Sequence, residues 1–327
     1  MKFIVYGAGA VGGVVGALLA EAGEQVVLIA RGAHAEAIRR SGLIVESPDG
    51  RRVVQVPVVE RPASIEVAAD DAVLLGMKSQ DTVAALEAVR QSAPPSVPVV
   101  CLQNGVDNER AALRLFPNVY GVCVMCPCSH LEPGVVEASS SPIPGLLDVG
   151  RYPAGTDSTS EAIAAAFKRA SFESVERPDI MRWKYRKLLM NLGNAIEAVC
   201  EPPVDPDFRR RVIDEGGACL RAAGIEFVSE EEDAERRAGL LKIQPVAGQL
   251  RQGGSSWQSL ERKAGSIESD YLNGEIVLLG RIHGVATPAN ELLQAVAVEM
   301  ALSGAGPRSR PMEELQRRLD QAGARRS

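Results

Sequence analysis

Apolar runs of strand character alternate with amphipathic segments through the first half of the chain. Such runs occupy residues 2–6, 25–30, 71–76 and 97–102, and helical periodicity follows several of them. This alternation is typical of a parallel sheet that is covered by helices. From Ile180 onward strand-like runs almost vanish and helical periodicity dominates. The pattern therefore predicts an α/β N-terminal domain followed by an all-α C-terminal domain.

Turn and breaker residues place the remaining elements. The pattern predicts a hairpin over 42–59 with its turn at Pro48-Asp49-Gly50, and strands that close the sheet at 119–128, 134–138 and 145–150. Helices are expected at 182–199, 207–223, within 258–283, at 289–302 and at 312–321. We expect domains at 1–178 and 179–318, with a flexible tail at 319–327.

The first apolar run leads directly into a G-x-G-x-x-G motif that opens a helix. Gly7 permits the sharp turn, Gly9 leaves room for a pyrophosphate, and Gly12 lets the helix pack close to the strand. The helix N-terminus offers free N–H groups to the phosphates. A strand, a glycine turn and a helix in this order predict a Rossmann-type domain that binds a dinucleotide, with the cofactor site running from Gly7 through Ala8, Gly9, Ala10 and Val11 to Gly12.

The end of the second apolar run indicates which dinucleotide is bound. Proteins that bind NAD usually carry an acidic residue there, which holds the ribose hydroxyls. Here the run ends at Ala30, and Arg31 follows. Because an arginine suits the 2′-phosphate that only NADP(H) carries, we expect NADPH/NADP, with Arg31 in the cofactor site. The alternative is a solvated arginine in a loop.

Polar loops follow two further strands of the expected sheet. The run at 71–76 leads into Met77-Lys78-Ser79-Gln80, and the run at 97–102 leads into Gln103-Asn104-Gly105. Ligands bind at the carboxyl ends of strands in open α/β sheets, so both loops are candidate ligand loops. Asn104 is the stronger candidate for contact with the cofactor or the substrate, although an asparagine before a glycine is also a common turn residue.

One helical face in the second half combines a cation with two amides. Lys187, Asn191 and Asn194 follow one another at spacings of four and three residues in a stretch rich in Leu and Met. Unpaired buried amides are costly, so a structural helix rarely places them on its apolar side. A boundary helix with a hydrated polar stripe is the alternative. Ser256 stands at an expected helix start, where capping also explains a serine. Glu268 lies among small and apolar residues and could pair with a lysine, and a surface acid is the alternative.

Composition excludes several classes of partner. The net charge of −6 lacks the positive footprint of a nucleic-acid-binding protein. No apolar stretch reaches the length of a membrane span without a charge or a glycine. Because Met1 leads straight into the first apolar run, we expect no signal peptide and a cytoplasmic protein.

Three cysteines and a histidine lie close together in the sequence. Cys123, Cys126, Cys128 and His130 resemble a zinc-binding run, but no second ligand pair stands at zinc-ribbon spacing elsewhere. Free cysteines are common in apolar interiors. We therefore expect no bound metal and an apolar strand or loop here.

These motifs together resemble the ketopantoate reductase (2-dehydropantoate 2-reductase) family. The resemblance rests on motifs spread from Gly7 to Pro288 in the family's order. They are the glycine motif, Arg31, Met-Lys78-Ser-Gln80, Gln103-Asn104-Gly105, Lys187-Leu-Leu-Met-Asn191, Ser255-Ser256-Trp-Gln258, Glu268-Ser-Asp-Tyr-Leu-Asn273-Gly274 and His283-Gly284-x-x-Thr287-Pro288.

The resemblance implies an NADPH-dependent reduction of a 2-oxo acid to a 2-hydroxy acid, with ketopantoate as the first substrate to consider. It implies that Lys187 is the general acid, that Glu268 accompanies it in the site, and that Ser256 contacts the substrate carboxylate. It assigns Asn104 and Asn191 to cofactor and substrate, which places Asn194 on the substrate side by its position. It also adds Lys78, Gln80 and Glu268 to the cofactor site.

The sequence departs from the family pattern at two places. The family usually reads Lys-x-x-x-Asn-x-x-x-Asn-Pro, whereas the second asparagine here is one residue early, at Asn194, and Ala195 follows. The cysteine-rich segment 122–128 replaces one that is commonly threonine-rich. A relative that acts on another 2-oxo acid or ketone therefore remains an alternative, as does a non-catalytic NADPH-binding sensor or interaction protein. A homodimer and the pathway, pantothenate biosynthesis or another, are left open.

Overall fold

The computed structural model describes residues 1–324, which fall into two compact units. Unit 1 comprises residues 1–184 together with 229–251, and unit 2 comprises 185–228 together with the described residues from 252 onward. The division between them lies six residues beyond the sequence-based boundary at 178, and one inner segment groups with unit 1. Of the tail expected at 319–327, residues 319–324 are helical, and 325–327 lie outside the described residues.

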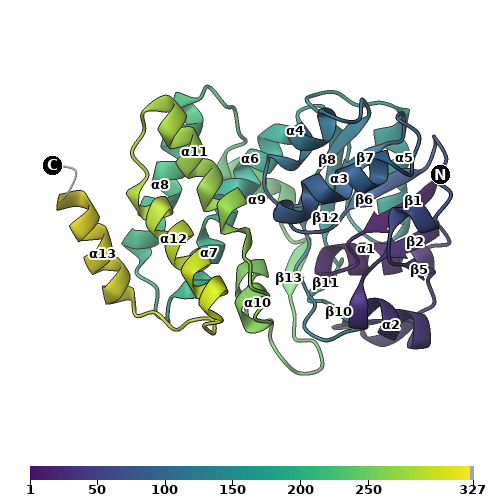
Figure 1. Ribbon diagram of the computed structural model, residues 1–327, viewed down its shortest axis with the longest axis horizontal. Helices are drawn as coiled ribbons and strands as arrows, with labels where there is room; N and C mark the ends of the chain where they lie inside the picture. The colour runs from purple at the N-terminus through teal and green to yellow at the C-terminus, as the bar shows by residue number, and fades with distance from the viewer. Residues whose placement is uncertain (325–327) are drawn as a thin grey trace. The chain divides into compact units, whose positions relative to one another are not determined.

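Unit 1 is built on a seven-stranded sheet in the order β12-β8-β7-β6-β1-β2-β5 (Figure 1). Every neighbouring pair is parallel except β12 with β8, which is antiparallel. The strands are β1 (Lys2–Tyr6), β2 (Gln25–Ile29), β5 (Val58–Val59), β6 (Ala72–Leu75), β7 (Val99–Cys101), β8 (Val119–Met125) and β12 (Leu146–Arg151). This is the α/β N-terminal architecture that the alternating pattern predicts.

Helices cover both faces of this sheet and bury its two sets of side chains. They are α1 (Ala10–Glu21), α2 (Gly32–Ser41), α3 (Thr82–Arg90), α4 (Asn108–Leu113) and α5 (Ser158–Arg169), with short 3-10 turns at Pro62–Ser64 and Ser79–Asp81. Phe3 and Val5 of β1 belong to one core with side chains of α1 and α5, whereas Ile4 belongs to the other, with side chains of α3. Each fully buried Leu, Val or Phe stabilises the fold by about 1.5–3 kcal/mol.

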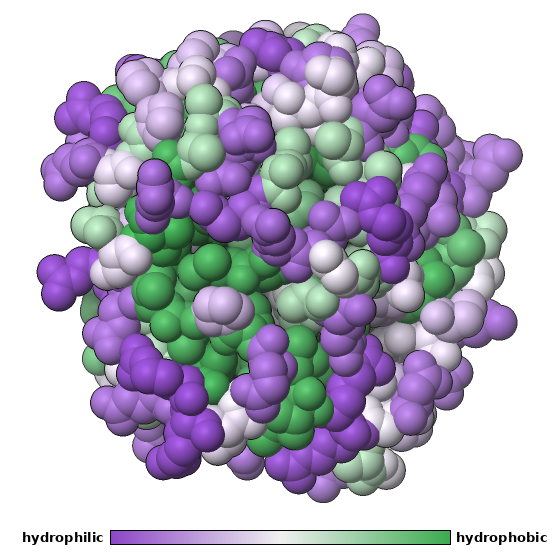
Figure 2. Space-filling view, turned by 90° about the vertical axis from the view of Figure 1, so that its right-hand side faces the viewer, coloured by the Kyte–Doolittle hydropathy of each residue, from purple (hydrophilic) through white to green (hydrophobic). Residues whose placement is uncertain are grey.

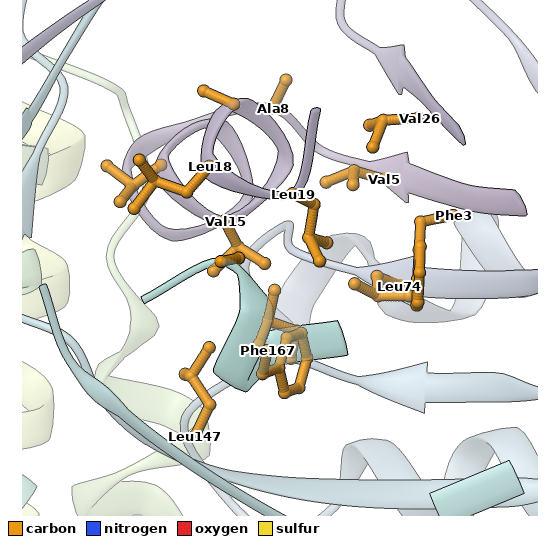
Figure 3. Close-up of a cluster of buried hydrophobic side chains, with 14 of the residues drawn as sticks. Phe3, Val5, Ala8, Val15, Leu18, Leu19, Val26, Leu74, Leu147 and Phe167 are labelled. Carbon is orange, nitrogen blue, oxygen red and sulfur yellow. The ribbon is translucent and has the colours of Figure 1, made fainter. Parts of the chain in front are cut away.

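The larger core lies between the sheet, α1 and α5. Figure 3 shows Val15 and Leu19 of α1 and Phe167 of α5 gathered with Leu74 and Leu147 of the sheet. Figure 2 shows one face of the molecule, on which a hydrophobic area left of the centre is bordered by hydrophilic side chains.

The expected hairpin is present but shorter than predicted. β3 (Leu43–Ser47) and β4 (Gly50–Val54) pair antiparallel across the turn. They belong to a second sheet, in the order β4-β3-β10-β9, with β10 (Val135–Ala138) and β9 (Cys128–Ser129). Val58 and Val59, the last residues of the predicted hairpin, instead form the edge strand of the main sheet beside β2.

Unit 2 is helical, as predicted. Its helices are α7 (Gly193–Val199), α8 (Pro206–Ala222), α10 (Ser255–Glu261), α11 (Asn273–His283), α12 (Pro288–Ser303) and α13 (Met312–Ala324), with a 3-10 turn, η3, at Glu268–Tyr271. The long helix expected at 182–199 is two helices, α6 (Ile180–Asn191) and α7, separated at Leu192. The helix expected within 258–283 is α11, and α10 and η3 precede it.

Residues 229–251, expected in the helical domain, group with unit 1 because a strand and an ion-pair cluster attach them there. β13 (Leu241–Ile243) pairs antiparallel with β11 (Ser140–Pro142). Arg236, on α9 (Glu230–Arg237), donates to both carboxylate oxygens of Asp148 at 2.9 and 2.7 Å and to Glu173 at 3.3 Å. Ser229 caps α9, because its Oγ accepts from the N–H of Glu232 at 3.1 Å.

Replacing Arg236 by glutamine should destabilise this attachment. Asp148 is only 3% exposed and would keep Arg177 but lose a bidentate partner. We expect the free energy of unfolding to fall by about 1–3 kcal/mol, measured by chemical denaturation, with faster proteolysis within 229–251. Arg90→Gln is the control, because it removes an exposed ion pair with Glu87 that contributes little. Equal stability of Arg236→Gln and wild type would contradict the attachment.

Candidate active site

The candidate ligand loops of unit 1 lie at one edge of the main sheet. β2, β1, β6 and β7 are consecutive parallel strands, and their last residues pair in register as Ile29 with Tyr6, Tyr6 with Leu75, and Leu75 with Cys101. The glycine turn, Arg31, the Lys78 loop and the Asn104 loop each follow one of these strands. The structure therefore brings together at the carboxyl edge the segments that the sequence assigned to cofactor binding.

Two glycines of the turn allow main-chain segments to approach closely at this edge of the sheet. Gly7 has a φ of +97°, and a Cβ added to it would lie 2.6 Å from the nitrogen of Met77. A Cβ on Gly12 would lie 2.2 Å from the carbonyl oxygen of Gly7. A Cβ on Gly9, by contrast, would meet nothing within 4 Å. Gly7 and Gly12 are thus required by packing, whereas Gly9 leaves open space before α1.

His34 braces the glycine turn from the side. Its Nδ1 accepts from the N–H of Gly134 at 2.9 Å, so its other ring nitrogen carries the proton and donates to the carbonyl oxygen of Ala8 at 2.7 Å. The ring centroid of His130 lies 4.2 Å from that of His34. The neutral His34 ring therefore links Ala8 of the glycine motif to the loop before β10. The sequence analysis missed this residue, since no spacing rule points to it.

A buried polar network ties the two other ligand loops together. The Gln103 side chain donates to the carbonyl oxygen of Met77 at 2.9 Å and to Oγ1 of Thr82 at 2.8 Å. Asn108 donates to Oγ of Ser79 at 3.1 Å and to the carbonyl oxygen of Asn104 at 3.0 Å. These bonds hold the main chain of both loops in a defined arrangement.

Arg31 stands where the sequence predicts, two residues after the end of β2. It is exposed and occupies the N-cap position of α2. Its guanidinium is therefore accessible to a ligand at the edge of the sheet. The acidic residue typical of NAD-binding proteins is absent at Ala30, which is 7% exposed.

The polar residues predicted in unit 2 lie on three of its elements. Lys187 is half-buried on α6, one turn before Asn191, which is 4% exposed. Asn194, at the start of α7, donates to Oδ1 of Asn191 at 3.4 Å, so the early asparagine still reaches its expected neighbour. A Cβ on Gly254 would lie 3.5 Å from Oδ1 of Asn194.

Ser256 and Glu268 complete the predicted set in unit 2. Ser256 is 1% exposed on α10, and its Oγ finds no hydrogen-bond partner within the described part of the chain. Buried hydroxyls are usually hydrogen-bonded, so the Ser256 hydroxyl is suited to bind a polar group of a ligand. Glu268 opens η3 and is 5% exposed, so it is not the surface acid that the sequence allowed as an alternative.

The cysteine segment lines apolar structure. Cys123 and Cys128 are buried, and Cys126 lies within 3.5 Å of the carbonyl oxygen of Pro144. A hydrogen bond from Cys126 lowers the pKa of the Cys128 thiol, although burial opposes this. In residues 1–324, no group of three or more His, Cys, Asp or Glu side chains is arranged to hold a metal ion.

Sequence reasoning also missed Lys184, which lies in the same stretch as Lys187. Its Nζ lies 2.5 Å from Oε1 of Glu109, and both side chains are almost fully buried. The sequence gives no signal for this pair, because Lys184 stands among other basic residues, Arg182, Arg186 and Lys187. Nothing along the chain indicates that Glu109 is its partner, because the two residues are far apart in sequence.

Comparison with known proteins identifies the family. The family model described as Ketopantoate reductase PanE/ApbA matches residues 3–153, and that of its C-terminal domain matches 179–301. The chain belongs to the ketopantoate reductase family. Its resemblance to that family, first apparent in the motifs, is thereby confirmed.

Curated relatives extend over nearly the whole chain. A 2-dehydropantoate 2-reductase from Pyrococcus horikoshii is 31% identical over 316 residues, covering 94% of this chain and 99% of the relative. One from Caulobacter vibrioides is 31% identical over 314 residues, covering 91% and 98%. Membership in this family makes the chain an oxidoreductase of the 2-dehydropantoate 2-reductase type, as the sequence predicts.

Solved structures agree on the fold. A PanE/ApbA family ketopantoate reductase from Ralstonia eutropha is 30% identical, with a TM-score of 0.77, and the match covers 93% of this chain and 99% of that one. A D-mandelate dehydrogenase with NADH and anilino(oxo)acetate gives a TM-score of 0.79 at 22% identity, over 93% and 99% of the two chains.

Among the described helices of this reductase, none is long and apolar enough to span a membrane.

Proposed function

We propose that this ketopantoate reductase family member uses NADPH to reduce a 2-oxo acid to a 2-hydroxy acid, and that ketopantoate, reduced to pantoate, is its substrate. The observation that carries the proposal is the 31% identity to a 2-dehydropantoate 2-reductase over 94% of this chain. The predicted polar residues support it, because they stand on ordered elements of both units.

The residues of unit 1 fit a dinucleotide phosphate. The open space at Gly9 leaves the main chain of the glycine turn accessible, and the N-terminus of α1 offers N–H groups to a pyrophosphate. Arg31 is exposed and free of a neighbouring acid at position 30, which suits a 2′-phosphate. Lys78, Gln80 and Asn104 lie on the adjoining loops and would contact the same cofactor.

The bound cofactor would supply a hydride to carbon 2 of the oxo acid. The chain must then stabilise negative charge on the neighbouring oxygen and protonate it. Lys187 carries both a positive charge and a proton, which assigns it the role of general acid. Asn191 and Asn194 are hydrogen-bonded to each other and would orient the substrate, and Ser256 would bind its carboxylate.

Glu268 is proposed to act beside Lys187 and to contact the cofactor. A buried carboxylate favours the protonated form of a lysine close to it, and this is the form that a general acid needs. Its burial on η3 is consistent with such a role.

A relative with another substrate is the second candidate. The D-mandelate dehydrogenase neighbour shares the fold and was solved with NADH and an oxoacetate derivative. The early asparagine, Asn194, and the cysteines at 126 and 128 depart from the family pattern. These departures favour a changed oxo acid, whereas an NADPH sensor without turnover would have no need of Lys187, Glu268 and Ser256 together.

A substrate panel tests the proposed function. Purified protein is mixed with NADPH and with ketopantoate, pyruvate, 2-oxoisovalerate or phenylglyoxylate, and NADPH oxidation is followed by absorbance. Ketopantoate should give the highest kcat/KM. Higher kcat/KM with another oxo acid would support the second candidate, and no oxidation with any of them would refute both enzymatic proposals.

Lys187→Ala should reduce kcat by about 10²- to 10⁴-fold, because general acid catalysis contributes this much. The Kd of NADPH should change little. Lys168→Ala, which removes an exposed lysine at the end of α5, is the control and should retain full activity. Retention of full kcat in Lys187→Ala would remove Lys187 from the proposed role.

Arg31→Ala should weaken NADPH binding by about 10- to 100-fold, since a charged hydrogen-bond partner is lost. NADH binding should change much less, because NADH lacks the 2′-phosphate. Both affinities are measured by fluorescence titration. Arg40→Ala, on the exposed side of α2, serves as the control. Equal losses for NADPH and NADH in Arg31→Ala would contradict a phosphate contact.

A further inference from the structure

A buried ion pair lies within unit 1, behind the Asn104 loop. Nζ of Lys184 and Oε1 of Glu109 are 2.5 Å apart, and their side chains are 2% and 0% exposed. Burying two charges carries a large desolvation penalty, which their mutual attraction offsets only when further hydrogen bonds satisfy the groups. Apolar side chains would fill this space with less penalty, so the pair calls for a reason beyond stability.

The Lys184 ammonium uses its other donors on two main-chain carbonyls. It donates to the carbonyl oxygen of Gln103 at 2.9 Å and to that of Val122 at 3.3 Å. The β7–β8 ladder ends at the pair Cys101 with Gly121. Lys184 therefore supplies hydrogen bonds just beyond the end of the ladder, where β7 has stopped and β8 continues.

Gln103 connects the Lys184 ammonium to the two ligand loops through hydrogen bonds. Its carbonyl accepts from Lys184, while its side chain donates to Met77 and Thr82. Asn104 follows directly, and its own carbonyl accepts from Asn108. The main chain on both sides of the Gln103–Asn104 peptide is thus fixed, by Lys184 on one side and by Asn108 on the other.

Glu109 holds the Lys184 ammonium in place through the 2.5 Å contact. Full burial raises the pKa of the Glu109 carboxyl, and the Lys184 ammonium opposes that rise. Among the groups that favour the charged form of this carboxyl, the Lys184 ammonium has the largest effect.

The surrounding strand is shaped for this pair. A Cβ on Gly121 would lie 3.2 Å from Oε1 of Glu109 and 3.3 Å from Cδ of Lys184. The β8 position opposite the pair therefore holds a residue without a side chain, which leaves room for both charged groups.

We propose that Lys184 and Glu109 are positioning residues that hold the Gln103-Asn104-Gly105 loop in the conformation that binds the nicotinamide cofactor. They act through the main chain of Gln103 and do not touch the reacting atoms. The proposal rests on the function proposed above only in taking Asn104 as a cofactor contact.

The test separates stability from positioning. Lys184→Met and Glu109→Leu each leave a buried charge without its partner and should lower the unfolding temperature. The double variant removes both charges and should regain most of that temperature. We nevertheless expect its Kd for NADPH to stay raised about tenfold, because the carbonyl of Gln103 has lost its charged donor. Amide hydrogen exchange in 103–106 should also stay faster than in wild type.

Control variants complete the design. Arg236→Gln disrupts another buried ion pair of unit 1 and should lower the unfolding temperature without changing the Kd. Lys184→Arg keeps the charge and should retain an affinity closer to wild type, and it replaces the double variant in the comparison if that variant does not fold. Wild-type Kd and exchange rates in a stable double variant, or a Lys184→Arg affinity no better than that of Lys184→Met, would overturn the proposal.

The outcome is independent of turnover. The proposed function fails if none of the 2-oxo acids supports NADPH oxidation by the wild-type protein. The NADPH affinities and the exchange rates of the variants would still decide the role of the Lys184–Glu109 pair.

Discussion

The close approach of main-chain segments at the carboxyl edge of the sheet is the constraint on which the cofactor half of this protein depends. Gly7 and Gly76 lie against each other where β1 and β6 end, and a Cβ on Gly76 would be 2.8 Å from the carbonyl oxygen of Gly7. Gly12 brings the first turn of α1 onto the same point. Any side chain there would force the helix away from the strand, and with it the free N–H groups of the helix N-terminus.

Around this contact the chain uses buried polar groups to specify loop conformation. His34 holds Ala8, the network of Gln103 and Asn108 joins the two ligand loops, and Lys184 supports Gln103 from behind. Such groups stabilise a fold less than apolar packing does, because each must first be taken out of water. They restrict the loops to a few conformations, since a hydrogen bond forms only within a narrow range of distances and angles. A site that must place a nicotinamide precisely benefits from that restriction.

In unit 2, buried side-chain hydrogen bonds also fix the conformation of the main chain, at the break between α6 and α7. Asn194 of α7 donates to Oδ1 of Asn191 at the end of α6, so the two asparagines are hydrogen-bonded across the break between these helices. Asn273, fully buried at the start of α11, donates to the carbonyl oxygen of Leu192 in that break and to Asn290 of α12. The break is thus a hydrogen-bonded feature of the fold, and the departure from the family spacing is absorbed locally.

By itself, the sequence determined the order of strands and helices, the glycine turn, the helical second half and the family, because each of these follows from local periodicity or from motifs of contiguous residues. It also placed Arg31 and Asn104 in loops after strands of the sheet, and Asn191 and Ser256 on helices, where the structure has them. Only the tertiary structure decided that residues 229–251 belong with the sheet, that Val58 and Val59 join its edge, and that Lys184 pairs with Glu109. These features depend on contacts between residues far apart in the chain, such as Arg236 with Asp148. Periodicity indicates which face of an element is buried, but it does not indicate which distant element packs against that face.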